Sequence, residues 1–95
     1  MTAIIVARIT VIDPEKMKAY GAAAGPTVAG HEGIFTLRGK HSETLLGDDA
    51  SQAVAIIQFP SIKAAQGWFN SPEYQALQGL RDEAAKMQFS FFEVA

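Results

Sequence analysis

The chain has 95 residues, a formal net charge of −2 and no cysteine, and 48% of its residues are hydrophobic while 19% are charged. This length supports a single domain over residues 1–95, and the absence of cysteine excludes disulfides, thiolate metal sites and a cysteine nucleophile. The eight Lys and Arg residues are scattered, which argues against nucleic-acid binding, and no apolar run approaches the roughly 20 residues of a membrane span.

The first predicted element is a strand over residues 2–12, which is rich in β-branched side chains. The odd positions in 5–11 are all apolar and the even positions are mixed, so we expect one face of this strand to be dry. Asp13-Pro14 then predicts a helix start, with an N-cap followed by proline at the first helical position. We expect this helix to kink or restart at Gly25-Pro26, because proline has no N–H, and to end near Gly30.

A second strand is expected from Ile34 to about Leu46, directly after Gly33. Simple alternation places Phe35 and Leu37 on one face of it and Thr36, Arg38 and Lys40 on the other. Gly39 in the middle of the strand suggests a bulge or a close backbone approach. A turn at Gly47-Asp48-Asp49 leads to a third predicted strand, Ala53–Phe59.

Two short helices are predicted after the third strand. Ser61 is a good N-cap for the first of them, and Ser71-Pro72 is an N-cap with proline at the first helical position of the second. The break between them is expected at Asn70-Ser71. A fourth strand is expected over Met87–Val94, where apolar and polar residues largely alternate.

The predicted order is β-α-β-β-α-β. With right-handed crossovers this order gives an α+β fold of the ferredoxin-like, split βαβ type, with one four-stranded antiparallel sheet and helices on a single face. The other face of the sheet would then carry an apolar group that is large for a soluble monomer: Ile4, Val6, Ile12, Val54, Ile56, Phe92 and Val94. We therefore expect a homodimer in which two copies stack these faces, and the alternative is a monomer with a partly apolar open face.

Several segments together resemble one known family, the domain-of-unknown-function 1330 family, over almost the whole chain. They are Val11-Ile12-Asp13-Pro14 with the following Tyr20, Arg38-Gly39, Phe59-Pro60-Ser61 and Ser71-Pro72-Glu73-Tyr74-Gln75. The resemblance implies membership of the dimeric α+β barrel superfamily, in which two ferredoxin-like sheets form a shared barrel. That superfamily includes cofactor-independent monooxygenases, haem-degrading enzymes and muconolactone isomerases. The haem-degrading members use a histidine in the second helical region, and residues 61–86 contain none, which argues against haem chemistry.

Six residues are candidates for a site. Arg38, next to Gly39, suits a carboxylate or enolate oxygen, and the alternative is a structural ion pair, for example with Glu93 or with an acidic residue of the partner copy. His31 could act as a general base, since histidine is the residue type that exchanges protons near neutral pH, or it could simply complement the helix dipole. The remaining four are aromatic residues that could line a pocket between helices and sheet, with Tyr20 moving a proton, or could be plain core: Tyr20, Trp68, Phe69 and Tyr74.

No metal site and no cofactor are expected. His41, Glu43, Asp48 and Asp49 gather around the hairpin between the second and third strands, but their spacing matches no known ligand motif, and a solvated loop explains them better. The absence of a secretory signal at the N-terminus is compatible with a cytoplasmic location.

Two functions are compatible with these residues. One is the binding of a small apolar or aromatic anionic metabolite, by an enzyme that resembles a cofactor-independent monooxygenase or isomerase, with Arg38 holding an anionic oxygen and His31 or Tyr20 moving a proton. The alternative is a non-catalytic binding or stress-related dimer. A third, a ligand-sensing regulatory module, ranks last because no DNA-binding or signalling segment is visible. Whether the protein is an enzyme is left open by the residues alone.

Overall fold

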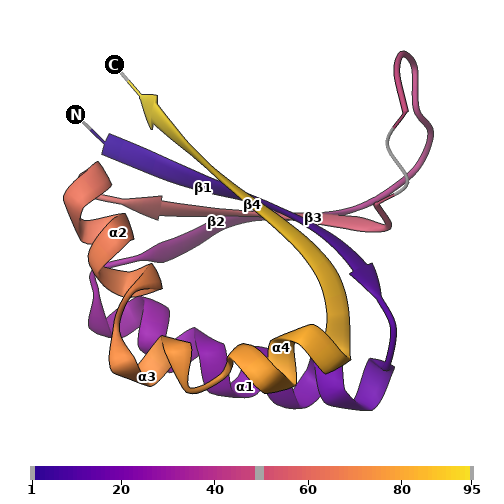
Figure 1. The fold of residues 1–95 in the computed structure, drawn as a ribbon. Coiled ribbons are helices and arrows are strands. Elements are labelled where there is room, and N and C mark those ends of the chain that lie inside the picture. Colours follow the sequence, from indigo (N-terminus) through magenta and orange to yellow (C-terminus); the bar gives the residue numbers. More distant parts are fainter. Residues whose placement is uncertain (1, 49–50, 95) are drawn as a thin grey trace.

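A computed structural model describes residues 2–48 and 51–94. The elements follow one another as β1 (Thr2–Val11), α1 (Pro14–Gly30), β2 (Ile34–Lys40), β3 (Ala53–Phe59), α2 (Ile62–Phe69), α3 (Pro72–Gln75), α4 (Gln78–Ala84) and β4 (Ala85–Val94). The four strands form one antiparallel sheet in the order β2-β3-β1-β4. All helices lie on one face of this sheet (Figure 1). The predicted α+β, ferredoxin-like fold is confirmed.

The predicted helix starts are confirmed at three places. The Asp13 side chain accepts from the backbone N–H groups of Glu15 and Lys16, and those of Ser61 and Ser71 each accept from a first-turn N–H of the helix that follows. Each of these caps satisfies a donor that has no carbonyl partner within its helix. Helix α1 ends at Gly30 as expected, but it continues through Pro26 without a restart.

Three element boundaries differ from the prediction. Strand β2 ends at Lys40 rather than near Leu46, because its partner β3 begins at Ala53, the residue paired with Lys40. Beyond this pair the chain leaves the sheet as a projecting loop (Figure 1). Strand β4 begins at Ala85 rather than Met87, because pairing with β1 continues to Val11. The region after Asn70 holds two short helices instead of one. The predicted turn at 47–49 includes Asp49, which lies outside the described residues.

The β2–β3 register contains the irregularity that matters most for the site. Phe35 pairs with Ile57 and Leu37 pairs with Ile56, so Thr36 is an extra residue in β2, and its hydroxyl donates to the Ile56 carbonyl oxygen at 3.3 Å. The bulge therefore lies at Thr36 and not at Gly39. An extra residue reverses the alternation that follows it. The predicted faces of Leu37 and Arg38 were wrong for this reason: Arg38 pairs with Ala55 on the helix-covered face, and Leu37 lies on the open face.

The core lies between the helices and the sheet. Its largest fully buried side chains are Trp68, Tyr74, Phe59, Ile5 and Val28. On the opposite face, no helix of the described residues covers the sheet (Figure 1). There Ile34 and Leu37 are 65% and 56% exposed, and they extend the apolar group expected on this face.

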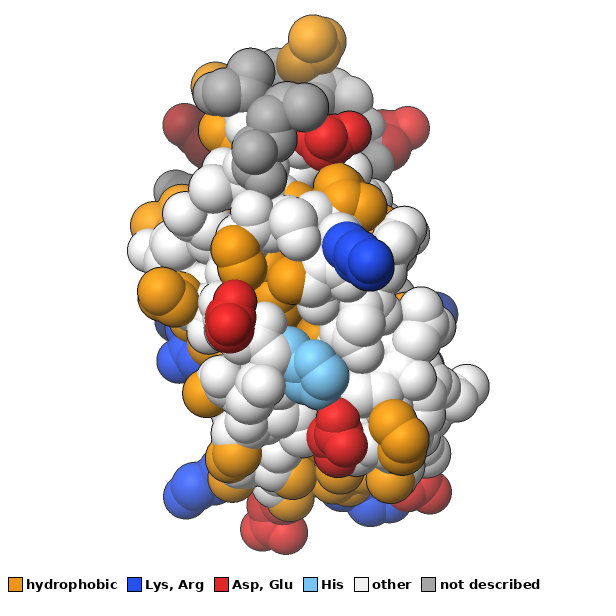
Figure 2. All heavy atoms as spheres, turned by 90° about the vertical axis from the view of Figure 1, so that its left-hand side faces the viewer, with side chains coloured by type: hydrophobic (Ala, Val, Ile, Leu, Met, Phe, Trp, Pro, Cys, Tyr) orange, Lys and Arg blue, Asp and Glu red, His pale blue; other side chains and the backbone are white. Residues whose placement is uncertain are grey.

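Two further observations describe the surface. Viewed from the left of Figure 1, acidic and basic side chains are interspersed with hydrophobic and uncharged ones and are not gathered by sign (Figure 2). Among the described residues, no helix has the length and apolar character needed to span a bilayer.

Candidate functional site

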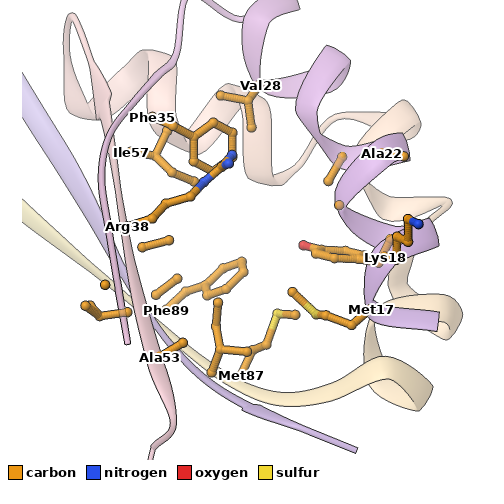
Figure 3. Close-up of a pocket in the computed structure, with 18 of the residues that line it drawn as sticks. Met17, Lys18, Ala22, Val28, Phe35, Arg38, Ala53, Ile57, Met87 and Phe89 are labelled. Carbon is orange, nitrogen blue, oxygen red and sulfur yellow. The ribbon is translucent and has the colours of Figure 1, made fainter. Parts of the chain in front are cut away.

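A cavity of about 380 Å³ lies between α1 and the helix-covered face of the sheet (Figure 3). Its lining is mostly apolar, because α1 and all four strands each contribute apolar side chains to it. Helix α1 contributes Met17, Tyr20, Ala24 and Val28 to the lining, the sheet contributes Phe35, Ile57, Met87 and Phe89, and α2 contributes Trp68. A cavity of this size and character can accept a small ligand with one or two rings.

Arg38 is the polar group that the bulge brings to this cavity. Its guanidinium carbon lies 4.3 Å from the centre of the Phe35 ring, a cation–π contact that holds the head group against the cavity wall (Figure 3). Within residues 2–48 and 51–94, no carboxylate or other hydrogen-bond acceptor contacts this guanidinium. The ion pair with Glu93 that was considered as an alternative is not formed, and the other alternative, an acidic residue of a partner copy, stays a prediction. Arg38 is an exposed residue, so its guanidinium N–H donors are accessible to water.

Lys18 also lines the cavity, but it contributes its stem rather than its charge. Figure 3 shows its nitrogen turned away from the cavity, toward the outer side of α1. Arg38 and Lys18 therefore form a natural pair for comparison. Both carry one positive charge and both contribute to the lining, but only Arg38 has its charged group against the cavity wall.

Tyr20 lines the cavity from α1 and is 6% exposed. Its hydroxyl lies 2.7 Å from that of Tyr74, which is fully buried and lies behind the cavity rather than in its lining. Arg81 donates from Nη1 to the Tyr74 hydroxyl at 3.4 Å, and its guanidinium lies 5.8 Å from the Tyr74 ring centre. Burial raises the pKa of Tyr20, because a phenolate would lose its hydration there, so this group stays protonated at neutral pH.

Trp68 and Phe69 lie at the end of α2 and differ in position. Trp68 lines the cavity, and its indole N–H donates to the Thr27 hydroxyl at 3.0 Å. That hydroxyl in turn donates to the Ala24 carbonyl oxygen at 2.6 Å. Phe69 does not line this cavity; it borders an adjoining hollow of about 240 Å³ together with Arg81 and Phe89. The Trp68 ring also packs against the rings of Phe59 and Tyr74, whose centres lie 5.7 and 4.3 Å from its own, so ring contacts and the N–H hydrogen bond together hold it in the cavity wall.

His31 lies outside the cavity lining. Its Nε2 is 2.8 Å from Oε1 of Glu73, so the pair joins the end of α1 to α3. The hydrogen bond from His31 is the main reason that the pKa of Glu73 is lowered. Of the six candidate residues, the structure thus brings Tyr20, Arg38 and Trp68 to one cavity and places Phe69, Tyr74 and His31 around it or away from it.

No metal site was predicted from the sequence, and the structure describes three of the four residues that gather around the hairpin. Among all of the described residues, no group of three His, Cys, Asp or Glu side chains could hold a metal ion. His41 instead pairs with the Thr44 hydroxyl through Nε2 at 2.9 Å. Asp49, one of the four residues around this hairpin, lies outside the described part of the chain.

Several residues of the site were not singled out from the sequence. Met17, Phe35, Met87 and Phe89 line the cavity, and their signal was available, since all four lie on the apolar faces of their elements. Arg81 gave no such signal. Its relation to Tyr74 depends on how α4 packs against the helices before it, and nothing in its neighbours along the chain indicates that contact.

Comparisons with known proteins agree with this architecture. The model of the family DUF1330, a domain of unknown function, matches residues 2–95. None of the curated proteins matches the chain. Solved structures share its fold, among them the following three.

The RPA0582 protein of unknown function from Rhodopseudomonas palustris has a TM-score of 0.81 and 20% identity, covering 99% of this chain and 82% of its own. SnoaB, a cofactor-independent oxygenase from Streptomyces nogalater, has a TM-score of 0.73 and 17% identity, covering 99% and 93%. A dimeric ferredoxin-like protein of unknown function from Thermobifida fusca has a TM-score of 0.64 and 10% identity, covering 99% and 92%. At these identities the likeness concerns the fold alone.

Proposed function

Because the chain belongs to the DUF1330 family, whose function is unknown, we propose a function from the cavity itself: the protein binds a small apolar or aromatic anion between α1 and the sheet. The observation that carries this proposal is the Arg38 guanidinium at a mostly apolar cavity, without an acidic partner among the described residues. The apolar walls hold the body of the ligand, and the guanidinium binds its carboxylate or enolate oxygen in a bidentate manner.

A reaction that needs no cofactor is the finer part of the proposal. The shared fold with SnoaB supports it only as an analogy, since fold does not determine chemistry. The residues around the cavity favour a modest role for the protein in such a reaction: Arg38 orients an anionic oxygen, and Tyr20, which stays protonated, donates a hydrogen bond rather than removing a proton. His31 is occupied with Glu73 outside the cavity lining, so we assign it no part in the chemistry.

Calorimetric titration with 2-naphthoate, an aromatic carboxylate that a cavity of this size can hold, tests the binding. We expect Arg38→Met to raise the Kd by roughly 3- to 10-fold, or about 0.6–1.4 kcal/mol, because a bidentate ion pair at an exposed site lies near the upper end of the range for surface ion pairs. Lys18→Met is the matched control, and we expect it to change the Kd by less than about 2-fold, because its charge points away from the cavity. Equal effects of the two substitutions would show that binding responds only to net charge, and absence of binding by the wild type would refute the proposal.

Whether the ligand is recovered unchanged or converted distinguishes the alternative, a non-catalytic binding protein, from an enzyme. Incubation of the protein with 2-naphthoate and related aromatic acids in aerated buffer, followed by chromatography, shows whether any is converted. Conversion that Arg38→Met slows supports the enzymatic part of the proposal. Ligands that bind and return unchanged support the non-catalytic alternative and leave the binding site intact. We propose a cytoplasmic location for either function.

We also propose that the protein is a homodimer formed through the open face of the sheet. Support comes from the exposed apolar side chains there, which include Phe92 at 51% exposure as well as Ile34 and Leu37, and from the dimeric state named for the Thermobifida fusca neighbour. Phe92→Glu is expected to give a 10.2 kDa monomer in light scattering, while Ala19→Glu on the exposed surface of α1 leaves the dimer unchanged. A wild-type monomer at about 10 µM, a concentration at which a stable interface stays associated, would contradict this proposal.

A further inference from the structure

Three side chains form a hydrogen-bonded series that runs from α4 to the cavity. Arg81 contacts the Tyr74 hydroxyl, and that hydroxyl contacts the Tyr20 hydroxyl at 2.7 Å. Each phenol has one O–H proton to donate. The directions of the hydrogen bonds therefore decide which of the two O–H groups has no acceptor within the series. The direction can be worked out from what each group is able to donate and accept.

The direction of the first hydrogen bond, between Arg81 and Tyr74, is fixed by the chemistry of arginine. A guanidinium has only N–H donors and no acceptor, so Arg81 must donate to the Tyr74 oxygen. The proton of Tyr74 must then go elsewhere. Tyr74 is 1% exposed, and within the described residues its hydroxyl has no contact besides Arg81 and Tyr20. If Tyr20 were the donor, the Tyr74 proton would be buried without an acceptor, which is costly. Tyr74 therefore donates to Tyr20.

The O–H group that has no acceptor within the series is that of Tyr20. Its oxygen already accepts from Tyr74, and its own O–H finds no acceptor among residues 2–48 and 51–94. Tyr20 is more than nine-tenths buried and lines the cavity, so a molecule in the cavity can supply the acceptor that the described residues do not. The Arg81 charge polarises both phenols in the same direction, which makes the terminal O–H a better donor than an isolated phenol.

We infer that the Tyr20 hydroxyl donates a hydrogen bond to an acceptor oxygen of the bound molecule, and that Tyr74 and Arg81 act as positioning residues that set its direction. This inference rests on the proposed binding function and narrows the ligand class. The ligand carries two oxygen functions on an apolar ring body: an anionic one at Arg38, and a carbonyl or phenolate oxygen at Tyr20. The raised pKa of Tyr20, caused by burial, supports this role because the group keeps its proton.

Two planar aromatic acids of nearly equal shape test the inference. 6-Acetyl-2-naphthoate has a ketone oxygen where 6-isopropenyl-2-naphthoate has a methylene group, and both have the carboxylate that Arg38 would bind. We expect the wild-type protein to bind the ketone more tightly by roughly 2- to 12-fold, the range of one hydrogen bond between neutral groups. Tyr20→Phe should abolish this preference by weakening ketone binding alone. The infrared carbonyl stretch of the bound ketone should lie at lower frequency in the wild type than in Tyr20→Phe.

Tyr74→Phe is the control for a purely structural effect. Both substitutions remove the hydrogen bond between Tyr20 and Tyr74 and so share that cost in stability, which thermal unfolding measures. Only Tyr20→Phe removes the donor that faces the cavity, so Tyr74→Phe should keep a preference for the ketone and a lowered carbonyl frequency. Both effects should be smaller than in the wild type, because Tyr74 no longer directs the Tyr20 O–H.

The possible outcomes separate this inference from the proposed function. Equal loss of preference in both variants, or a wild type that binds both acids equally and shows no shift in the carbonyl stretch, overturns the role of Tyr20 and leaves the binding site intact. Failure of the wild type to bind either acid overturns the proposed function, and this inference with it.

Discussion

Gly33 lies between the end of α1 and the start of β2, and its lack of a side chain is a packing requirement. A Cβ atom built on Gly33 would lie 2.6 Å from Cγ1 of Val28 and 2.7 and 2.8 Å from Cε1 and Cζ of Phe59. Carbon atoms prefer separations of about 3.5–4.0 Å, so each of these contacts is about 1 Å too short. Val28 and Phe59 are both fully buried, and neither can move aside without displacing the core. We therefore expect Gly33→Ala to destabilise the protein by about 1–3 kcal/mol, the cost of overpacking a close-packed interior.

The backbone at Gly33 cannot relieve this strain by shifting. Its N–H donates to the Val28 carbonyl oxygen at 2.9 Å, and the Glu32 N–H donates to that of Ala29 at 3.2 Å, which together close the end of α1 as a Schellman motif. Moving the Cβ away from Phe59 would break these bonds. For a domain of this length, a loss of about 2 kcal/mol lowers the Tm by roughly 8–16 °C.

Gly21→Ala is the matched control, because it adds the same atom at a glycine with open space around it. Gly21 lies inside α1, and a Cβ there would meet nothing within 4 Å. We expect this substitution to stabilise the protein by about 0.5–1 kcal/mol, since glycine is the poorer helix former. Urea unfolding followed by circular dichroism, at one protein concentration for all variants, measures both. If Gly33→Ala proved as stable as the wild type, the steric reasoning would be refuted.

Two further predictions concern polar contacts outside the ligand itself. Thr27→Val keeps the shape of the side chain but leaves the buried Trp68 indole N–H without an acceptor. We therefore expect the free energy of unfolding to fall by about 1–3 kcal/mol, as measured by urea unfolding followed by fluorescence. An unchanged midpoint would mean that this hydrogen bond adds no stability. His31→Ala should change how stability depends on pH in the acidic range. The lowered pKa of Glu73 in the folded protein stabilises the fold at pH values above the ordinary glutamate pKa of 4.5, and this stabilisation is lost as the pH falls through the pKa of the folded state. Tm measurements from about pH 3 to 6 should show a shallower decline for His31→Ala than for the wild type, and parallel curves would contradict this role.

Local sequence signals predicted much of the fold because the physical causes are themselves local. An N-cap depends on a side chain and an N–H two or three residues later, so Asp13, Ser61 and Ser71 could be recognised without any tertiary contact. Strand periodicity likewise predicted which face of β1 is buried. The limits of β2 and β4 could not be predicted in this way, because a strand ends where its partner ends and the partner is distant in the chain.

The end of α1 shows the same distinction at single residues. The sequence offers Gly30 and Gly33 on either side of His31-Glu32, and glycine is the usual residue for the left-handed position that ends a helix. In the structure that position is taken by Glu32, with φ of 65°. Gly33 is required instead by the approach of Val28 and Phe59.

What the sequence by itself determined is the order of elements, the helix starts, the dry face of β1 and the set of aromatic and cationic residues from which a site could be built. Only the tertiary structure decided which of them meet. The extra residue at Thr36 in β2 carries Arg38 from the open face of the sheet to the cavity, and the packing of α4 places Arg81 behind Tyr74 and Tyr20. Both depend on contacts between segments far apart in the chain, and alternation or helical periodicity within one segment carries no information about such contacts.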